Sequence, residues 1–303
     1  MVSSRRHFLS IGALGSLATF LNACTGSGTQ SDSQRQGPQI VSLFSTNRVI
    51  AAGRPERLPF GLVDGGADLA DAAEVAVRVL LNGEVIETLA VAGRIVDHDH
   101  APGAGDHEHA NLLRYYAVRT TLPEVGIYDF EVTVGDTILV LPVQAFDPAE
   151  IDLPITGDVF PSLETPTISE PREVDPVCTL FDGPCPFHTR TAADVLAEGQ
   201  PMALLVATPA FCATSYCGPV LNTLIEASTA YESIGFVHVE PWANPTEGTG
   251  LTDPNLRTSP SVDDLRLTFE PSLFLVDRSG LLVERIDNVF DATELTAALD
   301  VIA

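Results

Sequence analysis

The sequence contains no lysine: all 16 of its basic residues are arginine, set against 41 aspartate and glutamate residues, and the formal net charge is -25. A surface this acidic repels phosphate backbones and anionic lipid headgroups. We therefore exclude nucleic acid as a partner. Any attachment to a membrane is expected to come from a lipid rather than from a basic patch.

Long hydrophobic runs are also lacking. The apolar stretch Ile11 to Leu21 is too short for a comfortable transmembrane helix, but it follows Arg5-Arg6 at the spacing of an export signal. We predict a signal peptide over residues 1–23 of the twin-arginine type, with the general secretory route as the alternative. The following Leu21-Asn22-Ala23-Cys24 resembles a bacterial lipobox. This resemblance implies lipidation at Cys24 and anchoring at the outer face of the cytoplasmic membrane.

Cysteine is scarce, with five residues in the chain. Setting Cys24 aside as the lipidation site leaves an even number, which suits disulfides or a dithiol in an oxidising compartment. These four are Cys178, Cys185, Cys212 and Cys217.

The rest of the chain divides by composition. Residues 24–39 are rich in Gly, Ser, Thr and Gln and predict a disordered tether. Residues 40–147 carry short β patterns separated by turns and predict a small β-sandwich, and the approach to Tyr128 resembles the tyrosine corner of immunoglobulin-like domains. Residues 148–176 read as a proline-rich linker. The strand patterns cover residues 57–63, 74–81, 85–91, 114–121, 127–134 and 137–145.

Over residues 177–303 the spacing of apolar residues changes and predicts the element order β-α-β-α-β-β-α, with a helix expected over residues 219–231. This order, with Cys212 and Cys217 after the first strand and Pro271 before the last hairpin, resembles the thioredoxin fold over about residues 195–303. The resemblance implies a cis Glu270-Pro271 bond beside the cysteines. The predicted fold class is thus multidomain, an all-β immunoglobulin-like sandwich followed by an α/β thioredoxin-like domain.

The spacing of Cys212 and Cys217 departs from the thioredoxin pattern, because four residues rather than two separate them. Alignment from the strand makes Cys212 the nucleophile, whereas alignment on Tyr216-Cys217-Gly-Pro219 makes it Cys217. On an ideal helix residues five apart are ~8.7 Å apart, which exceeds the roughly 7 Å limit for a disulfide. The pair can therefore bond only if Cys212 lies in a loop. A helix starting near Pro219 allows this and favours Cys217 as the attacking sulfur.

The pair Cys178 and Cys185 has two interpretations. The turn at Gly183-Pro184 favours a local structural disulfide, and the alternative is exchange of electrons with Cys212 and Cys217, with His188 as a nearby base. We expect no zinc here, since neither cysteine pair has the two-to-four-residue spacing of a zinc knuckle with a matching histidine pair.

Four of the seven histidines lie in one loop between predicted strands, interleaved with acidic residues. Such a loop can capture copper, zinc or nickel, or it can be a polar hairpin loop without a ligand. His238 is interpreted as a core histidine in an apolar strand. The candidate loop ligands are His98, His100, His107 and His109.

Together these patterns predict an exported thiol-disulfide oxidoreductase that acts on the thiols or disulfides of extracytoplasmic proteins, with Cys212, Cys217 and Pro271 at its site. It would require no cofactor, although the histidine loop could hold a metal ion. The alternatives are a copper or other metal-binding or delivery protein, and a non-catalytic binding module with structural disulfides. The direction of electron flow depends on a reduction potential that the motifs do not encode.

Overall fold

The computed structural model describes residues 37–64, 67–68, 73–97, 112–212, 216–245 and 255–303. Strands predominate and helices are few. The described residues all belong to one compact unit, and none of their helices has the length and apolar character needed to cross a bilayer. The predicted signal peptide, Cys24 and nearly all of the predicted tether lie outside these residues.

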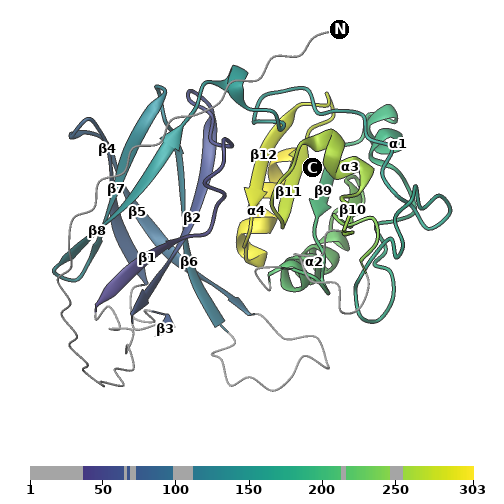
Figure 1. Ribbon diagram of the computed structural model, residues 1–303, viewed down its shortest axis with the longest axis horizontal. Helices are drawn as coiled ribbons and strands as arrows, with labels where there is room; N and C mark the ends of the chain where they lie inside the picture. The colour runs from purple at the N-terminus through teal and green to yellow at the C-terminus, as the bar shows by residue number, and fades with distance from the viewer. Residues whose placement is uncertain (1–36, 65–66, 69–72, 98–111, 213–215, 246–254) are drawn as a thin grey trace, which may run out of the picture. The chain divides into compact units, whose positions relative to one another are not determined.

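The larger sheet is built from the N-terminal strands and is nearly closed on itself like a barrel (Figure 1). Its strand order is β1-β2-β6-β5-β4-β7-β8, with β3 paired to β2, and every pairing is antiparallel. The strands are β1 (Pro38–Ser42), β2 (Pro55–Asp64), β3 (Ala67–Asp68), β4 (Glu74–Leu81), β5 (Glu84–Asp97), β6 (Leu112–Thr121), β7 (Gly126–Val134) and β8 (Thr137–Ala145).

Alternation along these strands places the core inside the sheet. Every second residue of β7 is buried, because successive side chains of a strand point to opposite faces. The same alternation in β4 turns three valines inward. The inward residues of these two strands are Val75, Val77, Val79, Tyr128, Phe130 and Val132.

The prediction of a two-sheet immunoglobulin-like sandwich was wrong. The strand expected over residues 85–91 continues to Asp97, so β5 is 14 residues long. Its first part pairs with β4, and Gly93 to Asp97 pair with β6. This one strand therefore joins what would have been two sheets into a single path. The local part of the prediction is confirmed, since the Tyr128 hydroxyl donates to the Glu124 carbonyl at 2.8 Å and accepts from its N–H at 2.9 Å.

The smaller sheet has the order β10-β9-β11-β12, in which only β10 and β9 are parallel. All five residues of β9 are buried, as expected for a strand covered on both faces. The elements of this part are η1 (Pro148–Glu150), α1 (Ala192–Ala197), β9 (Met202–Val206), α2 (Cys217–Ser228), β10 (Gly235–Val239), α3 (Pro260–Leu265), β11 (Ser272–Val276), β12 (Leu282–Asp287) and α4 (Ala292–Ile302).

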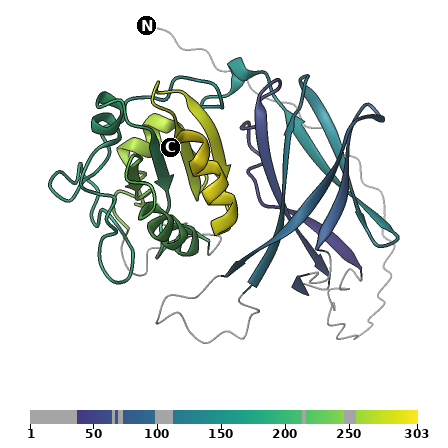
Figure 2. The same ribbon diagram turned by 180° about the vertical axis from the view of Figure 1, so that it is seen from behind.

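Helices cover both faces of this sheet (Figures 1 and 2). Leu205 of β9 and Leu273 of β11 belong to the same apolar cluster as α2 and α4. Leu204 and Phe274, the neighbours of these residues in the same strands, belong to the cluster that contains α1, α3 and the core of the larger sheet. The core is therefore continuous from the larger sheet to one face of the smaller one.

The predicted α/β thioredoxin-like domain was also wrong. The described residues are mostly β with few helices, and two of the four α-helices among them have only six residues. Over the described part of the chain, no separate α/β domain of that type is present. The mixed four-stranded sheet instead continues the compact β-rich unit through a shared core.

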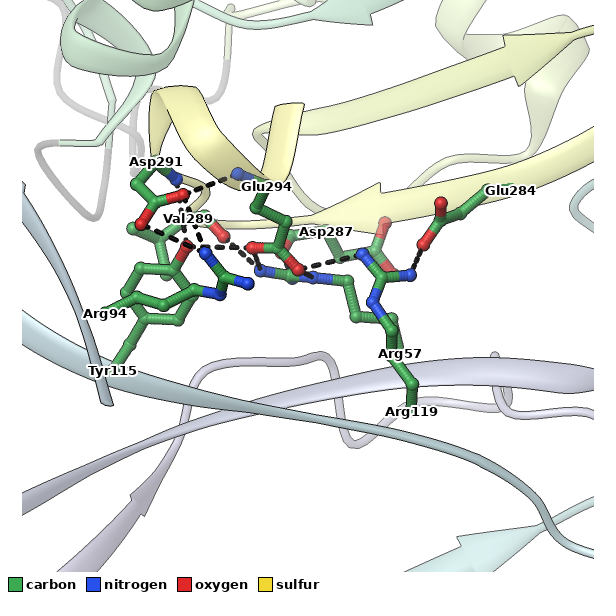
Figure 3. A network of polar contacts seen from close by, with 9 residues as sticks. All are labelled: Arg57, Arg94, Tyr115, Arg119, Glu284, Asp287, Val289, Asp291 and Glu294. Carbon is green, nitrogen blue, oxygen red and sulfur yellow. Dashed lines mark hydrogen bonds and ion pairs between the residues drawn. The ribbon is translucent and has the colours of Figure 1, made fainter. Parts of the chain in front are cut away.

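A buried charged network joins α4 to the larger sheet (Figure 3). The Arg57 guanidinium donates to both Glu294 carboxylate oxygens at 2.8 and 2.7 Å, and to the carbonyls of Asp287 and Val289 at 3.0 and 2.6 Å. The Tyr115 hydroxyl donates to Glu294 at 2.8 Å. Arg119 adds a further contact with Glu294 and an ion pair with Glu284, and Arg94 pairs with Asp291.

Candidate functional site: a cysteine-histidine cluster and a thiol pair

Five residues that the sequence singled out cannot be placed, because they lie outside the described residues. They are Cys24, His98, His100, His107 and His109. The remaining candidates fall into two groups. Cys212 and Cys217 form a thiol pair, and Cys178 and Cys185 meet two histidines in a second cluster.

The thiol pair is assembled by the loop after β9 and the start of α2. Helix α2 begins at Cys217, two residues before the expected start at Pro219, and Cys212 lies outside the helix. The N–H of Cys217 donates to the Cys212 sulfur at 3.4 Å. The loop therefore does fold back, as the helix geometry required for these two sulfurs to approach.

The two sulfurs have different environments. Cys217 is completely buried, whereas Cys212 is half-buried, and neither is in a disulfide. Burial raises the pKa of the Cys217 thiol well above its usual value, and its hydrogen bond with Cys212 raises it further. The Cys217 N–H at the start of α2 donates to the Cys212 sulfur, so the helix N-terminus stabilises the half-buried sulfur rather than the fully buried one.

Pro271 directly precedes β11, and the Glu270-Pro271 bond is cis, as the sequence resemblance predicted. Burial and the contact with Cys212 are the main causes of the raised pKa of Cys217, and the charge of Glu270 adds to them. Glu270 also lines a pocket of about 460 Å³ whose walls include Val206 and Trp242. Neither Cys212 nor Cys217 is among the residues that line this pocket.

The second cluster brings four buried side chains together from distant parts of the sequence. Nδ1 of His238 lies 3.6 Å from the Cys178 sulfur, 3.5 Å from the Cys185 sulfur and 2.9 Å from Nε2 of His188. Cys178 and Cys185 are 4.0 Å apart and do not form a disulfide. The four ligand-type atoms all lie within 4.8 Å of one another, so the cluster could hold a metal ion.

A turn and a sheet edge position these side chains. Gly183 adopts a φ of +105°, which glycine tolerates best, and its N–H donates to the Leu180 carbonyl at 3.2 Å. The chain then runs beside β10, the edge strand, where the His238 N–H donates to the Phe187 carbonyl at 3.3 Å. Stacking of Phe187 on Phe236, with ring centroids 5.4 Å apart, holds the segment there.

Hydrogen bonding assigns the tautomer of His238. Its Nε2 lies 2.9 Å from the Ala207 carbonyl, which can only accept, so Nε2 carries a proton and Nδ1 faces the cluster. The hydrogen bond from Cys185 lowers the pKa of Cys178 against the opposing effect of burial. Burial would lower the pKa of His238, but the hydrogen bond and charge of Cys178 outweigh it and raise the value.

Thr179 connects the two groups. Its hydroxyl donates to the buried Glu240 carboxylate at 2.8 Å and accepts from the Ala210 N–H at 3.2 Å, in the loop that leads to Cys212. Burial raises the pKa of Glu240 to about 7. Cys178, Cys185 and Cys217 also belong to one apolar cluster. The cysteine-histidine cluster therefore packs against the same loop that carries the thiol pair.

Sequence reasoning missed the histidine partners of the second cluster. His238 was assigned to the apolar core, and it is fully buried, but its ring nitrogen faces two sulfurs. His188 was assigned only as a base. The short Cys185-x-x-His188 spacing was the available signal, whereas the contribution of β10 could not be read from spacing.

No protein-family model matches the chain, and no curated protein sequence matches it. The candidate chemistry therefore depends on the geometry alone. The half-buried Cys212 beside Cys217 can exchange thiols and disulfides, and the second cluster offers two sulfur and two nitrogen donors to a metal ion.

Proposed function

We propose that the protein is an extracytoplasmic thiol-disulfide oxidoreductase that acts on protein thiols or disulfides through Cys212 and Cys217. The supporting observation is the asymmetry of the pair: a half-buried sulfur accepts a hydrogen bond from the N-terminal amide of α2, and a buried partner sulfur adjoins it. Exchange chemistry needs an accessible thiolate and a second thiol that can close on it.

In this proposal Cys212 attacks and Cys217 resolves, the reverse of the order favoured by the helix start in the sequence. The Cys212 thiolate attacks one sulfur of a substrate disulfide, that disulfide breaks, and the departing substrate sulfur takes up a proton. Cys217 then loses its proton and attacks the Cys212 sulfur, which releases the second substrate sulfur as a thiol. Two electrons pass from the pair to the substrate, and Cys212 and Cys217 end as a disulfide.

Export and lipid anchoring at Cys24 belong to the same proposal, because they place the pair among extracytoplasmic proteins. The sequence-level alternative of metal delivery is less well supported, because all four donors of the second cluster are buried.

The test is a redox titration of the full chain against glutathione, with thiols counted by mass spectrometry at each step. An exchange protein should give a Cys212-Cys217 potential between roughly -120 and -270 mV. C212S should abolish mixed disulfides with an unfolded disulfide-containing substrate, and C217S should accumulate them at Cys212. As the control, C178S/C185S should still form mixed disulfides at Cys212, because both exchange sulfurs remain.

A potential below about -300 mV would identify the pair as a structural disulfide. Such a value would reject the exchange function and favour a non-catalytic binding module. Mixed disulfides that formed at Cys217 in C212S would instead contradict the assigned roles of the two sulfurs.

A further inference from the structure

We infer that Cys178, Cys185, His188 and His238 form a resident, tetrahedral zinc site. The inference is independent of the proposed exchange function, because it uses the other cysteine pair and a different chemistry. The donor set is two sulfurs and two imidazole nitrogens, a common composition for structural zinc. It overturns the expectation that these cysteines carry no zinc.

The separations between donor atoms agree with a tetrahedron around zinc. Bonds of about 2.3 Å to sulfur and about 2.0–2.1 Å to nitrogen require edges of about 3.8 Å between sulfurs, about 3.5 Å between sulfur and nitrogen and about 3.3 Å between nitrogens. The cluster has 4.0 Å between the cysteines, and 3.5 and 3.6 Å from their sulfurs to His238. Of these four edges, the His188 to His238 distance of 2.9 Å is the one that must lengthen.

Hydrogen bonding alone does not account for this convergence. Nδ1 of His238 has a single lone pair, because Nε2 carries the proton that bonds the Ala207 carbonyl. Three groups nevertheless approach Nδ1 within 2.9–3.6 Å: the two sulfurs and Nε2 of His188. A single acceptor cannot satisfy three donors, whereas one cation satisfies all four groups together.

The surroundings fit a metal ligand set in two further respects. The Ala207 carbonyl holds His238 in the tautomer that leaves Nδ1 available, which is the usual outer-shell support of a zinc-bound imidazole. The Cys185 N–H donates to the Cys178 sulfur at 3.5 Å, and such bonds stabilise a thiolate. Nδ1 of His188 is buried without a hydrogen-bond partner in the described part of the chain, so it is the one outer-shell position left open.

The position of the site indicates a structural role. Four protein donors close a tetrahedron and leave no place for a substrate, and all four are buried. The ion would tie the turn between Cys178 and Cys185, which has few regular hydrogen bonds, to the free edge of β10. Since Thr179 in that turn accepts from Ala210, zinc would also hold the loop that leads to Cys212.

The first experiment measures metal content in the full chain purified under reducing conditions. We expect roughly one zinc per chain by mass spectrometry of the digested protein, retained through dialysis without a chelator. C178S and H238Q should each lose more than nine-tenths of it. C212S is the matched control and should keep its zinc, because it removes one thiol, as C178S does, but from the other pair.

A second measurement does not depend on the variants folding. Cobalt added to the metal-stripped wild-type chain should give the ligand-field and thiolate charge-transfer absorption of a tetrahedral site with two sulfurs, and zinc should displace it. Iodoacetamide should label Cys212 but not Cys178 or Cys185 in the zinc form, and should label both of these after chelation.

The inference fails if the wild-type chain carries no zinc and binds none when zinc chloride is titrated into the reduced protein. Copper in place of zinc would also overturn it. So would a disulfide between Cys178 and Cys185 in freshly purified protein, the local crosslink that the sequence favoured. None of these outcomes decides whether Cys212 and Cys217 exchange with a substrate disulfide, and mixed disulfides at Cys212 are measured separately, so the two proposals fail separately.

Discussion

The two buried polar clusters of this protein differ in how their groups are satisfied. Around Arg57, the sequence supplies both signs of charge: one guanidinium meets the Glu294 carboxylate and two backbone carbonyls (Figure 3). Around His238, two sulfurs and a second imidazole converge on one ring nitrogen, and no cationic side chain accompanies them in the described residues. The first cluster is complete as it stands, and the second has the form of a ligand set.

This difference separates structural from binding roles among buried polar groups. A buried group that finds its partner within the chain costs little once the fold has formed. Where several buried groups approach a single acceptor, those left without a partner destabilise the fold. A bound ion can remove that penalty. The same criterion, applied to sequence alone, would have failed, because both clusters depend on contacts between residues more than 50 positions apart.

The largest expected effect comes from breaking the Arg57 network. R57M leaves the Glu294 carboxylate buried with only Tyr115 and the more exposed Arg119 as partners, and should lower the free energy of unfolding by about 3–5 kcal/mol. Urea unfolding followed by tryptophan fluorescence and circular dichroism measures this.

The double variant R57M/E294L is the control, because it removes both charges and keeps an apolar volume. It should recover much of the loss, since the penalty in R57M comes from an unpaired buried charge. If the double variant is as unstable as the sum of the two single variants, the residues act independently and the network assignment is wrong.

The unfolding free energy should also depend on pH through the Arg57 network. Burial would raise the pKa of Glu294, but the hydrogen bond and charge of Arg57, with Tyr115 and Arg119, lower it from 4.5 to about 2. A carboxylate with a lowered pKa stabilises the fold above its unfolded value, and this contribution is lost as pH falls from about 5 to about 2. The loss should amount to about 3 kcal/mol.

E294Q should weaken the dependence of the unfolding free energy on acidic pH, because glutamine does not titrate. The comparison is the slope of unfolding free energy against pH in the two proteins, since E294Q is also less stable at neutral pH. Equal slopes below pH 5 would show that other carboxylates cause the acid sensitivity.

Local patterns in the sequence identified much of the secondary structure. The alternation of β7 and the tyrosine corner at Tyr128 are set by neighbouring residues, and both were predicted. The fold was not, because it depends on how far β5 extends. Five more residues in that strand, Gly93 to Asp97, pair with β6 and turn a sandwich into one sheet.

The two candidate sites also differ in how much of each the sequence could predict. The loop geometry of Cys212 and Cys217 followed from helix dimensions and from Pro219, which are local. The partnership of His238 with Cys178 was hidden, because it requires knowing that the turn after Cys178 lies along the edge of β10. A buried histidine in an apolar strand has the same sequence pattern whether it packs in a core or binds an ion.

The smallest predicted effect is the loss of stability when a tyrosine hydroxyl is removed. Two such hydroxyls, each of which donates to a carboxylate, can be compared. Tyr115 does so inside the network, to Glu294 at 2.8 Å, and also accepts from the Asp291 N–H at 2.9 Å. Tyr231 donates to Asp300 at 2.6 Å on the surface. Y115F should lower the free energy of unfolding by about 1–3 kcal/mol, because it leaves buried groups without their partner.

Y231F is the matched control, since it removes the same hydroxyl where water can replace it, and it should cost less than about 1 kcal/mol. Urea unfolding at neutral pH measures both variants against wild type. Equal costs would mean that burial does not decide how strongly these hydroxyls matter. The contrast with the cysteine-histidine cluster would then lose its basis, because it requires that an unsatisfied buried group is more costly than an exposed one.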